Sequence, residues 1–123
     1  MQIDLRMIEG CYIYGQKFYL QQIDRVEATT KISRYYGMNS GSANGYIQAF
    51  YCMMNGERYT QSLNTKATEY YLKRIQEEYG IGQLLLALES VRNHIKYYES
   101  FGKGKLKSLE KVVKDFESAI GSQ

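Results

Sequence analysis

The sequence predicts an α+β fold, in which an antiparallel β-meander of about five to six strands over residues 2–63 precedes three helices. Three observations predict this fold. Apolar and polar residues alternate near the start, an Asn-Gly pair separates two strand-like segments, and apolar residues recur at heptad spacing in the second half. We therefore expect residues 1–123 to form a single domain, with a sheet in residues 1–63 and a helical part in residues 64–123.

Alternation with period 2 predicts strands in the first part of the chain. Ile3, Leu5 and Met7 alternate with polar neighbours, and this spacing places apolar side chains on one face of a strand. Further strand-like segments follow as far as residue 32. Residues 37–45 are rich in glycine, serine and asparagine, so we expect a flexible loop there.

The pair Asn55-Gly56 is the clearest turn signal in the sequence. Segments 46–54 and 57–63, which flank it, both contain strand-forming residues. Both central residues of a type I′ turn need positive φ, which asparagine and glycine adopt at low cost. The sequence therefore predicts a β-hairpin over residues 46–63.

Helical spacing and helix-end signals begin after residue 63. Apolar residues recur every four positions from Ala67 to Tyr79. Asn64 or Thr65 can cap the start of this helix, and Gly80 is the expected stop.

Two further segments, 81–98 and 106–120, have apolar residues at alternating spacings of three and four, which is a heptad pattern. Joined by a short glycine-containing loop, they predict an antiparallel helical hairpin. The combined apolar surface exceeds what we expect one small domain to bury, so we predict a homodimer. The residues predicted at its interface are Leu84, Leu85, Leu88, Val91 and Ile95.

Composition excludes several classes of protein. The chain is 44% hydrophobic and 24% charged, as is typical of globular proteins, and its net charge of +3 is too small to imply nucleic-acid binding by itself. No apolar run approaches the roughly 20 residues that span a bilayer. We expect a cytoplasmic protein in which Cys11 and Cys52 stay reduced.

Residues with catalytic potential are isolated from one another. His94 is the only histidine; it lies beside the heptad seam, where we expect a partly exposed polar residue. Cys11 and Cys52 fall in predicted strands, where a free cysteine usually behaves as a small buried apolar residue. We therefore predict no catalytic residue, no metal site, no cofactor and no enzymatic activity.

Basic and aromatic residues indicate two candidate binding surfaces. The first lies beside the predicted loop 37–45 and consists of Arg25, Lys31, Arg34, Tyr35 and Tyr36. On a sheet, such residues can bind single-stranded nucleic acid or a nucleotide, or they can protect a sheet edge from aggregation. The second consists of Lys103, Lys105 and Lys107 at the start of the last helix, either as a solvated face or as a patch for phosphate or an acidic partner.

These features favour a small non-enzymatic protein that acts through protein–protein contacts, of the kind with which mobile elements inhibit or regulate a larger complex. The alternative is a protein that binds nucleic acid or a nucleotide through a basic, tyrosine-rich sheet surface. Phosphate contacts lose affinity steeply with salt whereas an apolar interface does not, so a salt titration separates the two.

Overall fold

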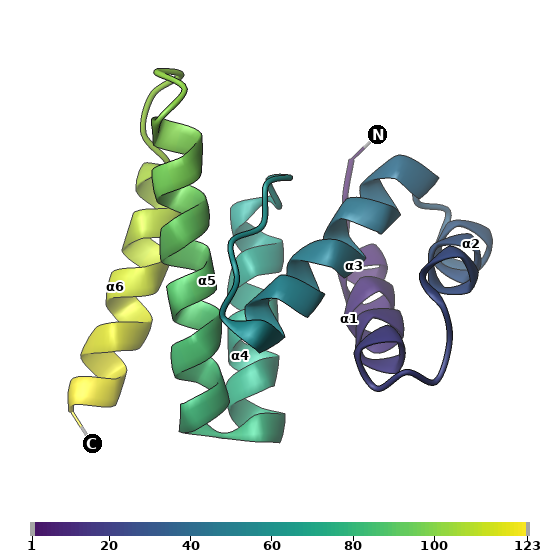
Figure 1. The fold of residues 1–123 in the computed structure, drawn as a ribbon, viewed down its shortest axis with the longest axis horizontal. Helices are drawn as coiled ribbons and strands as arrows, with labels where there is room; N and C mark the ends of the chain where they lie inside the picture. Colours follow the sequence, from purple (N-terminus) through teal and green to yellow (C-terminus); the bar gives the residue numbers. More distant parts are fainter. Residues whose placement is uncertain (1, 123) are drawn as a thin grey trace. The chain divides into compact units, whose positions relative to one another are not determined.

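The computed structural model describes residues 2–122, and this part of the chain consists of helices joined by irregular links, with no strand (Figure 1). The helices are α1 (Leu5–Tyr19), α2 (Arg25–Tyr36), α3 (Ser40–Asn55), α4 (Thr65–Tyr79), α5 (Ile81–Glu99) and α6 (Lys107–Gly121). The predicted α+β fold class, with its N-terminal β-meander, is therefore wrong. The chain divides into two compact units, one ending at Tyr51 and the other beginning at Cys52, so the boundary falls within α3.

Helix α1 replaces the first predicted strands. The Asp4 side chain caps it by accepting a hydrogen bond from the Met7 backbone N–H, at 2.9 Å. Its buried residues include Ile8, Cys11 and Gly15, which are spaced by three and four positions as on one face of a helix. The alternation at residues 3–7 covers too few positions to outweigh this longer helical period.

Helix α2 replaces the strand predicted up to residue 32. Asp24 caps it by accepting from the Glu27 N–H at 2.7 Å. Ala28 and Ile32 are both fully buried. Their spacing of four fits one helical face, whereas the same residues also fit a period of two. Helix α2 packs against α1.

The segment 37–45 was predicted to be a flexible loop, and most of it instead belongs to α3. Only residues 37–39 link α2 to α3. Asn39 Oδ1 accepts hydrogen bonds from the backbone N–H groups of Gly41 and Ser42, at 2.9 and 3.2 Å. These bonds satisfy free donors in the first turn of α3.

The predicted β-hairpin over residues 46–63 is also wrong. Helix α3 continues to Asn55, and Gly56 follows with a left-handed φ of 68°. A glycine of positive φ ends many helices, just as it completes a tight hairpin turn. The Asn-Gly pair thus ends a helix here, and residues 57–64 form an irregular link with no strand pairing within the described chain.

The second unit contains a bundle of α4, α5 and α6, each in contact with the other two. Asn64 caps α4 by accepting from the Ala67 N–H at 2.7 Å, and α4 ends at Tyr79 before Gly80, as predicted. Figure 1 shows α6 returning antiparallel to α5. The three C-terminal helices of the prediction are therefore present, including the antiparallel pair.

The heptad seam of α5 lies in the core of the chain. Leu84, Leu88 and Val91 are fully buried and Ile95 is only 7% exposed, whereas Leu85 is 49% exposed. Of the five residues predicted at a dimer interface, Leu85 alone keeps a large exposed surface. None of the helices formed by residues 2–122 combines the length and the apolar character needed to cross a membrane.

Candidate functional site

The predicted basic, tyrosine-rich surface lies on α2 rather than on a sheet. Lys31, Arg34 and Tyr35 share one face because they are three and four residues apart, and Tyr35 is 52% exposed. Arg25 and Tyr36 lie on the side nearer the neighbouring helices. The five predicted residues therefore divide between two sides of one helix.

Contacts with the rest of the first unit hold this second side in place. Arg25 Nε donates to Asn44 Oδ1 of α3 at 2.6 Å. The Arg6 guanidinium lies over the Tyr36 ring, with its central carbon 4.9 Å from the ring centroid. Arg6 also donates a hydrogen bond to the Tyr35 carbonyl oxygen at 2.7 Å. Tyr36 thus serves the packing of α2 on α1, while Arg25 lies where α2 meets α3.

A three-residue turn, Gly37-Met38-Asn39, joins α2 to α3. Gly37 adopts the left-handed conformation, with φ 71° and ψ 17°, and its N–H bonds to the Ser33 carbonyl. Met38 is 1% exposed, and its sulfur accepts from the Cys11 thiol of α1 at 3.3 Å. In Figure 1, α2 is seen nearly along its axis while α3 runs across the view, so the two axes are far from parallel. Two crossed helices joined by a short glycine-containing turn form a helix-turn-helix.

The first half of α3 exposes small polar groups on one side. Ser40, Gly41 and Asn44 are exposed, while Ala43 and Ile47 are fully buried. Near Tyr51 the helix is fixed to α1 by aromatic contacts: the Phe50 ring meets the Tyr12 ring edge-to-face, at a centroid distance of 5.2 Å. A rigid helix therefore presents hydrogen-bonding side chains to solvent at its N-terminal end.

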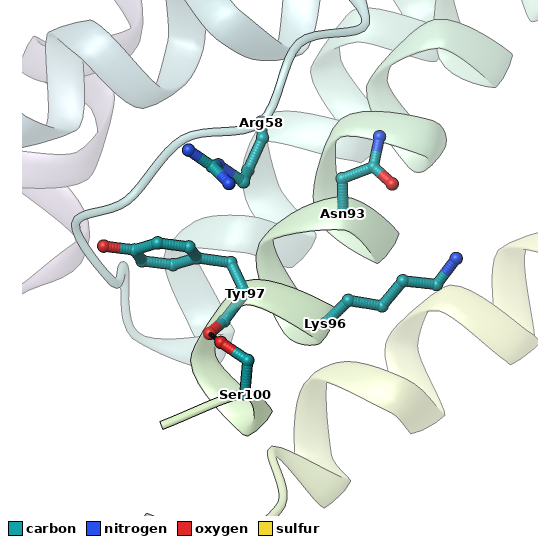
Figure 2. Close-up of a pocket in the computed structure, with 5 residues that line it drawn as sticks. All are labelled: Arg58, Asn93, Lys96, Tyr97 and Ser100. Carbon is teal, nitrogen blue, oxygen red and sulfur yellow. Dashed lines mark hydrogen bonds between the residues drawn. The ribbon is translucent and has the colours of Figure 1, made fainter. Parts of the chain in front are cut away.

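The second unit carries a separate hollow of about 580 Å3 on α5. We call it the α5 hollow; it is lined by Arg58, Asn93, Lys96, Tyr97 and Ser100 (Figure 2). Asn93, Lys96 and Tyr97 lie on one face of α5 and Ser100 caps its C-terminus, whereas Arg58 comes from the link 57–64. The Arg58 guanidinium lies over the Tyr97 ring, 4.5 Å from its centroid.

His94 fixes the link beside this hollow. Its Nδ1 lies 2.7 Å from the Tyr59 carbonyl oxygen and its Nε2 lies 3.2 Å from the Ser62 hydroxyl oxygen. Because a carbonyl only accepts, Nδ1 carries the proton and Nε2 accepts from Ser62. Burial lowers the pKa of His94, which favours this neutral form. The expectation of a partly exposed His94 is wrong, because the residue is fully buried.

Two cations, Arg58 and Lys96, line the α5 hollow. No carboxylate lines it. Within residues 2–122, neither Arg58 nor Lys96 belongs to an ion pair; the ion pairs found there are Lys31–Glu27, Arg74–Glu78, Arg92–Glu117 and Lys111–Asp115. Figure 2 shows the Arg58 and Lys96 side chains extending away from each other, and Lys96 also lines a second hollow together with Glu99, Glu110 and Glu117, so the two cations do not face one space.

The other predicted candidates do not assemble into a site. Lys103 and Lys105 lie in the link between α5 and α6, and Lys107 begins α6; all three are exposed and lie outside the lining of the α5 hollow. Cys11 and Cys52 are free and buried, and burial raises the pKa of the Cys11 thiol to about 12. Across the described chain, no three histidine, cysteine or acidic side chains are grouped as metal ligands.

Sequence reasoning missed the α5 hollow. The spacing of Asn93, Lys96, Tyr97 and Ser100 (three, one and three positions) would have indicated a shared helical face. Arg58 carried no such signal, because it was assigned to a strand and only the folded link brings it to α5.

The chain matches no protein-family model, and neither the curated proteins nor the solved structures include one significantly similar to it.

Proposed function

We propose that the protein binds double-stranded DNA through the helix-turn-helix formed by α2 and α3. The observation that carries this proposal is the turn itself: Gly37 is left-handed and Met38 is buried, so the polar start of α3 is held at a fixed angle to α2. In DNA-binding proteins of this architecture, the second helix enters the major groove with its N-terminal residues at the base edges.

The side chains at this surface have suitable chemistry. Asn44 is exposed on α3, and an asparagine amide can bond an adenine edge through one donor and one acceptor. Arg25, which donates to Asn44 from the start of α2, has further N–H groups for a phosphate. Arg34 adds positive charge on the outer face of α2, where Lys31 is paired with Glu27 at 3.3 Å.

Binding of a duplex pool, measured by fluorescence anisotropy over a range of salt concentrations, tests this function. Arg25→Gln should weaken binding to all sequences. It should also reduce, by about 1, the slope with which the logarithm of the binding constant falls against the logarithm of the salt concentration. Asn44→Ala should instead reduce discrimination between sequences, by about 1–3 kcal/mol at the affected base pair. Lys66→Gln, an exposed lysine at the start of α4, is the matched control and should change neither quantity.

The proposal fails if the unaltered protein shows no duplex binding at low salt, because even non-specific complexes have dissociation constants of about 10⁻⁴–10⁻⁶ M at physiological salt. It also fails if Arg25→Gln and Lys66→Gln reduce affinity equally. Binding that does not depend on salt would point to an apolar interface instead.

A second candidate function is action through protein–protein contacts, including self-association and the inhibition or regulation of a larger complex. One observation supports it: Ile81, Leu85 and Leu86 are 40%, 49% and 40% exposed at the start of α5. Ile81 and Leu85 are four residues apart, so their side chains share a face of the helix. Light scattering coupled to size exclusion tests self-association, since a monomer has a mass of 14.3 kDa.

A further inference from the structure

We infer that the helix-turn-helix recognises duplexes rich in A·T base pairs, with Asn44 and Gln48 of α3 each contacting an adenine in the major groove. This inference rests on the proposed function and names the class of duplex that the same site selects. It follows from the side chains that α3 presents to solvent, from the lack of charged residues in this helix, and from the orientation of the Asn44 amide.

The solvent-facing side of α3 carries two amide side chains. Between residues 43 and 50, Asn44 is exposed and Gln48 is partly exposed, whereas all the others are buried. Residues four apart lie on one side of a helix, so both amides belong to the same face. A rise of about 1.5 Å per residue separates them by about 6 Å along α3, which is roughly two base-pair steps of about 3.4 Å. Two amides at this spacing can contact bases within one short stretch of a duplex.

The chemistry of these side chains favours adenine. An amide presents an N–H donor and a carbonyl acceptor, which match the N7 acceptor and the N6 amino donor of adenine in the major groove. Guanine is contacted chiefly by arginine or lysine, and cytosine donates to aspartate or glutamate. Helix α3 has the sequence SGSANGYIQAFYCMMN and contains none of these four residue types. The helix therefore has contacts suited to A·T pairs and lacks the charged contacts that specify G·C pairs.

The orientation of the Asn44 amide is set by Arg25. Arg25 Nε donates to Asn44 Oδ1 at 2.6 Å. A flipped amide would place its own N–H groups against this donor, so Oδ1 stays on the side of Arg25. Oδ1 has a second lone pair for the adenine amino group, and Nδ2 can donate to N7. In the same position guanine would bring its O6 acceptor against Oδ1, so the fixed amide disfavours guanine.

The test compares three pools of duplexes of equal length by fluorescence anisotropy at constant salt. Their randomised cores contain only A·T, only G·C or only inosine·cytosine pairs. Inosine lacks the N2 amino group of guanine, so its pair with cytosine has the major-groove edge of G·C and the minor-groove edge of A·T. The A·T pool should bind at least about tenfold more tightly than the other two, because one amide–adenine contact is worth a factor of about 5–150.

Two substitutions assign the preference to α3. Asn44→Ala and Gln48→Ala should each reduce it about fivefold or more, and each should leave binding to the G·C pool unchanged. Circular dichroism checks that both variants are folded. Asn44 is exposed, so Asn44→Ala decides the question even if Gln48→Ala unfolds. Gln76→Ala, which removes a partly exposed glutamine on α4, is the matched control and should keep the full preference.

The outcomes separate this inference from DNA binding itself. Equal affinity for the A·T and G·C pools overturns the inference and leaves DNA binding in place. Inosine·cytosine bound as tightly as A·T also overturns it, because the preference would then come from the minor groove. A loss of preference in Gln76→Ala as large as in Asn44→Ala would contradict the contacts assigned to α3. If no duplex binds at low salt, the proposed function fails and this inference fails with it.

Discussion

The ring of Tyr59 stacks on the imidazole of His94, with centroids 4.2 Å apart and planes 9° from parallel. The same imidazole is bonded to the Tyr59 backbone through Nδ1. One residue of α5 therefore holds both the side chain and the backbone of the link, and with them the position of Arg58. The sole histidine of the sequence is thus a structural residue that supports the α5 hollow.

His94→Ala should destabilise the protein strongly. The substitution removes a buried ring, leaves a cavity beside Tyr59 and deprives the Tyr59 carbonyl of its hydrogen-bond donor. Together these losses should lower the unfolding free energy by about 2–4 kcal/mol. Urea denaturation followed by circular dichroism measures this cost. Ser62→Ala is the matched control. Ser62 is exposed, and its substitution removes only the hydrogen bond to His94 Nε2, so the unfolding free energy should fall by less than about 1 kcal/mol. Equal stability of His94→Ala and the unaltered protein would contradict the structural role of His94.

The unfolding free energy should fall as the pH drops below about 6.5, the ordinary pKa of histidine. Burial lowers the pKa of His94 in the folded state, so in this range the unfolded chain binds a proton that the folded chain does not. Stability is therefore complete above the unfolded pKa and decreases towards the lower folded pKa. Urea midpoints measured at several pH values from about 8 to 5.5 show the trend. In His94→Gln this part of the pH dependence should disappear; an unchanged slope would assign it to other groups.

Gly10→Ala should destabilise the packing of α2 on α1. A Cβ at Gly10 would lie 2.7–2.8 Å from three ring atoms of Tyr36, including Cγ, so the Tyr36 ring or the backbone of one helix would have to shift. Overpacking of this kind costs about 1–3 kcal/mol. Gly82→Ala is the control, because its new Cβ on α5 would meet nothing within 4 Å. Its unfolding free energy should be unchanged or rise by up to about 1 kcal/mol, since alanine has the higher helix propensity. Thermal unfolding of both variants tests the contrast, and a Gly10→Ala variant as stable as Gly82→Ala would contradict the close contact with Tyr36.

The sequence predicted the helices of the second unit well because their signals are local. The Asn64 cap, the Gly80 stop and the heptad spacing each lie within a few residues of the helix that they define. The prediction for the first half of the chain was wrong because its sequence patterns, over a few residues, fit a strand and a helix alike. Ala28 and Ile32 fit a strand and a helix equally well, and Asn55-Gly56 can end a helix as readily as it can turn a hairpin.

The candidate sites were predictable only in part. The residues of α2 were identified as a surface, but the strand interpretation hid the turn at Gly37 and therefore the helix-turn-helix. The α5 hollow depends on Arg58, which reaches α5 through hydrogen bonds from Ser90 and His94 to an irregular link. Such a link has no periodic pattern in sequence, so no spacing rule could place Arg58 beside Tyr97.

Substitutions at Leu85 and Leu88 should have opposite consequences. Leu88 is fully buried, so Leu88→Asp places a carboxylate in the core and should unfold the protein, because an unpaired buried charge costs several kcal/mol. Leu85 is 49% exposed, so Leu85→Asp should change stability by no more than about 0.5 kcal/mol. If the protein forms the proposed dimer through the exposed start of α5, light scattering of the unaltered chain gives twice 14.3 kDa. The folded Leu85→Asp variant should then return to the monomer mass. A monomer mass for the unaltered chain at micromolar concentration would eliminate the dimer, and a doubled mass that persists in Leu85→Asp would exclude Leu85 from its interface.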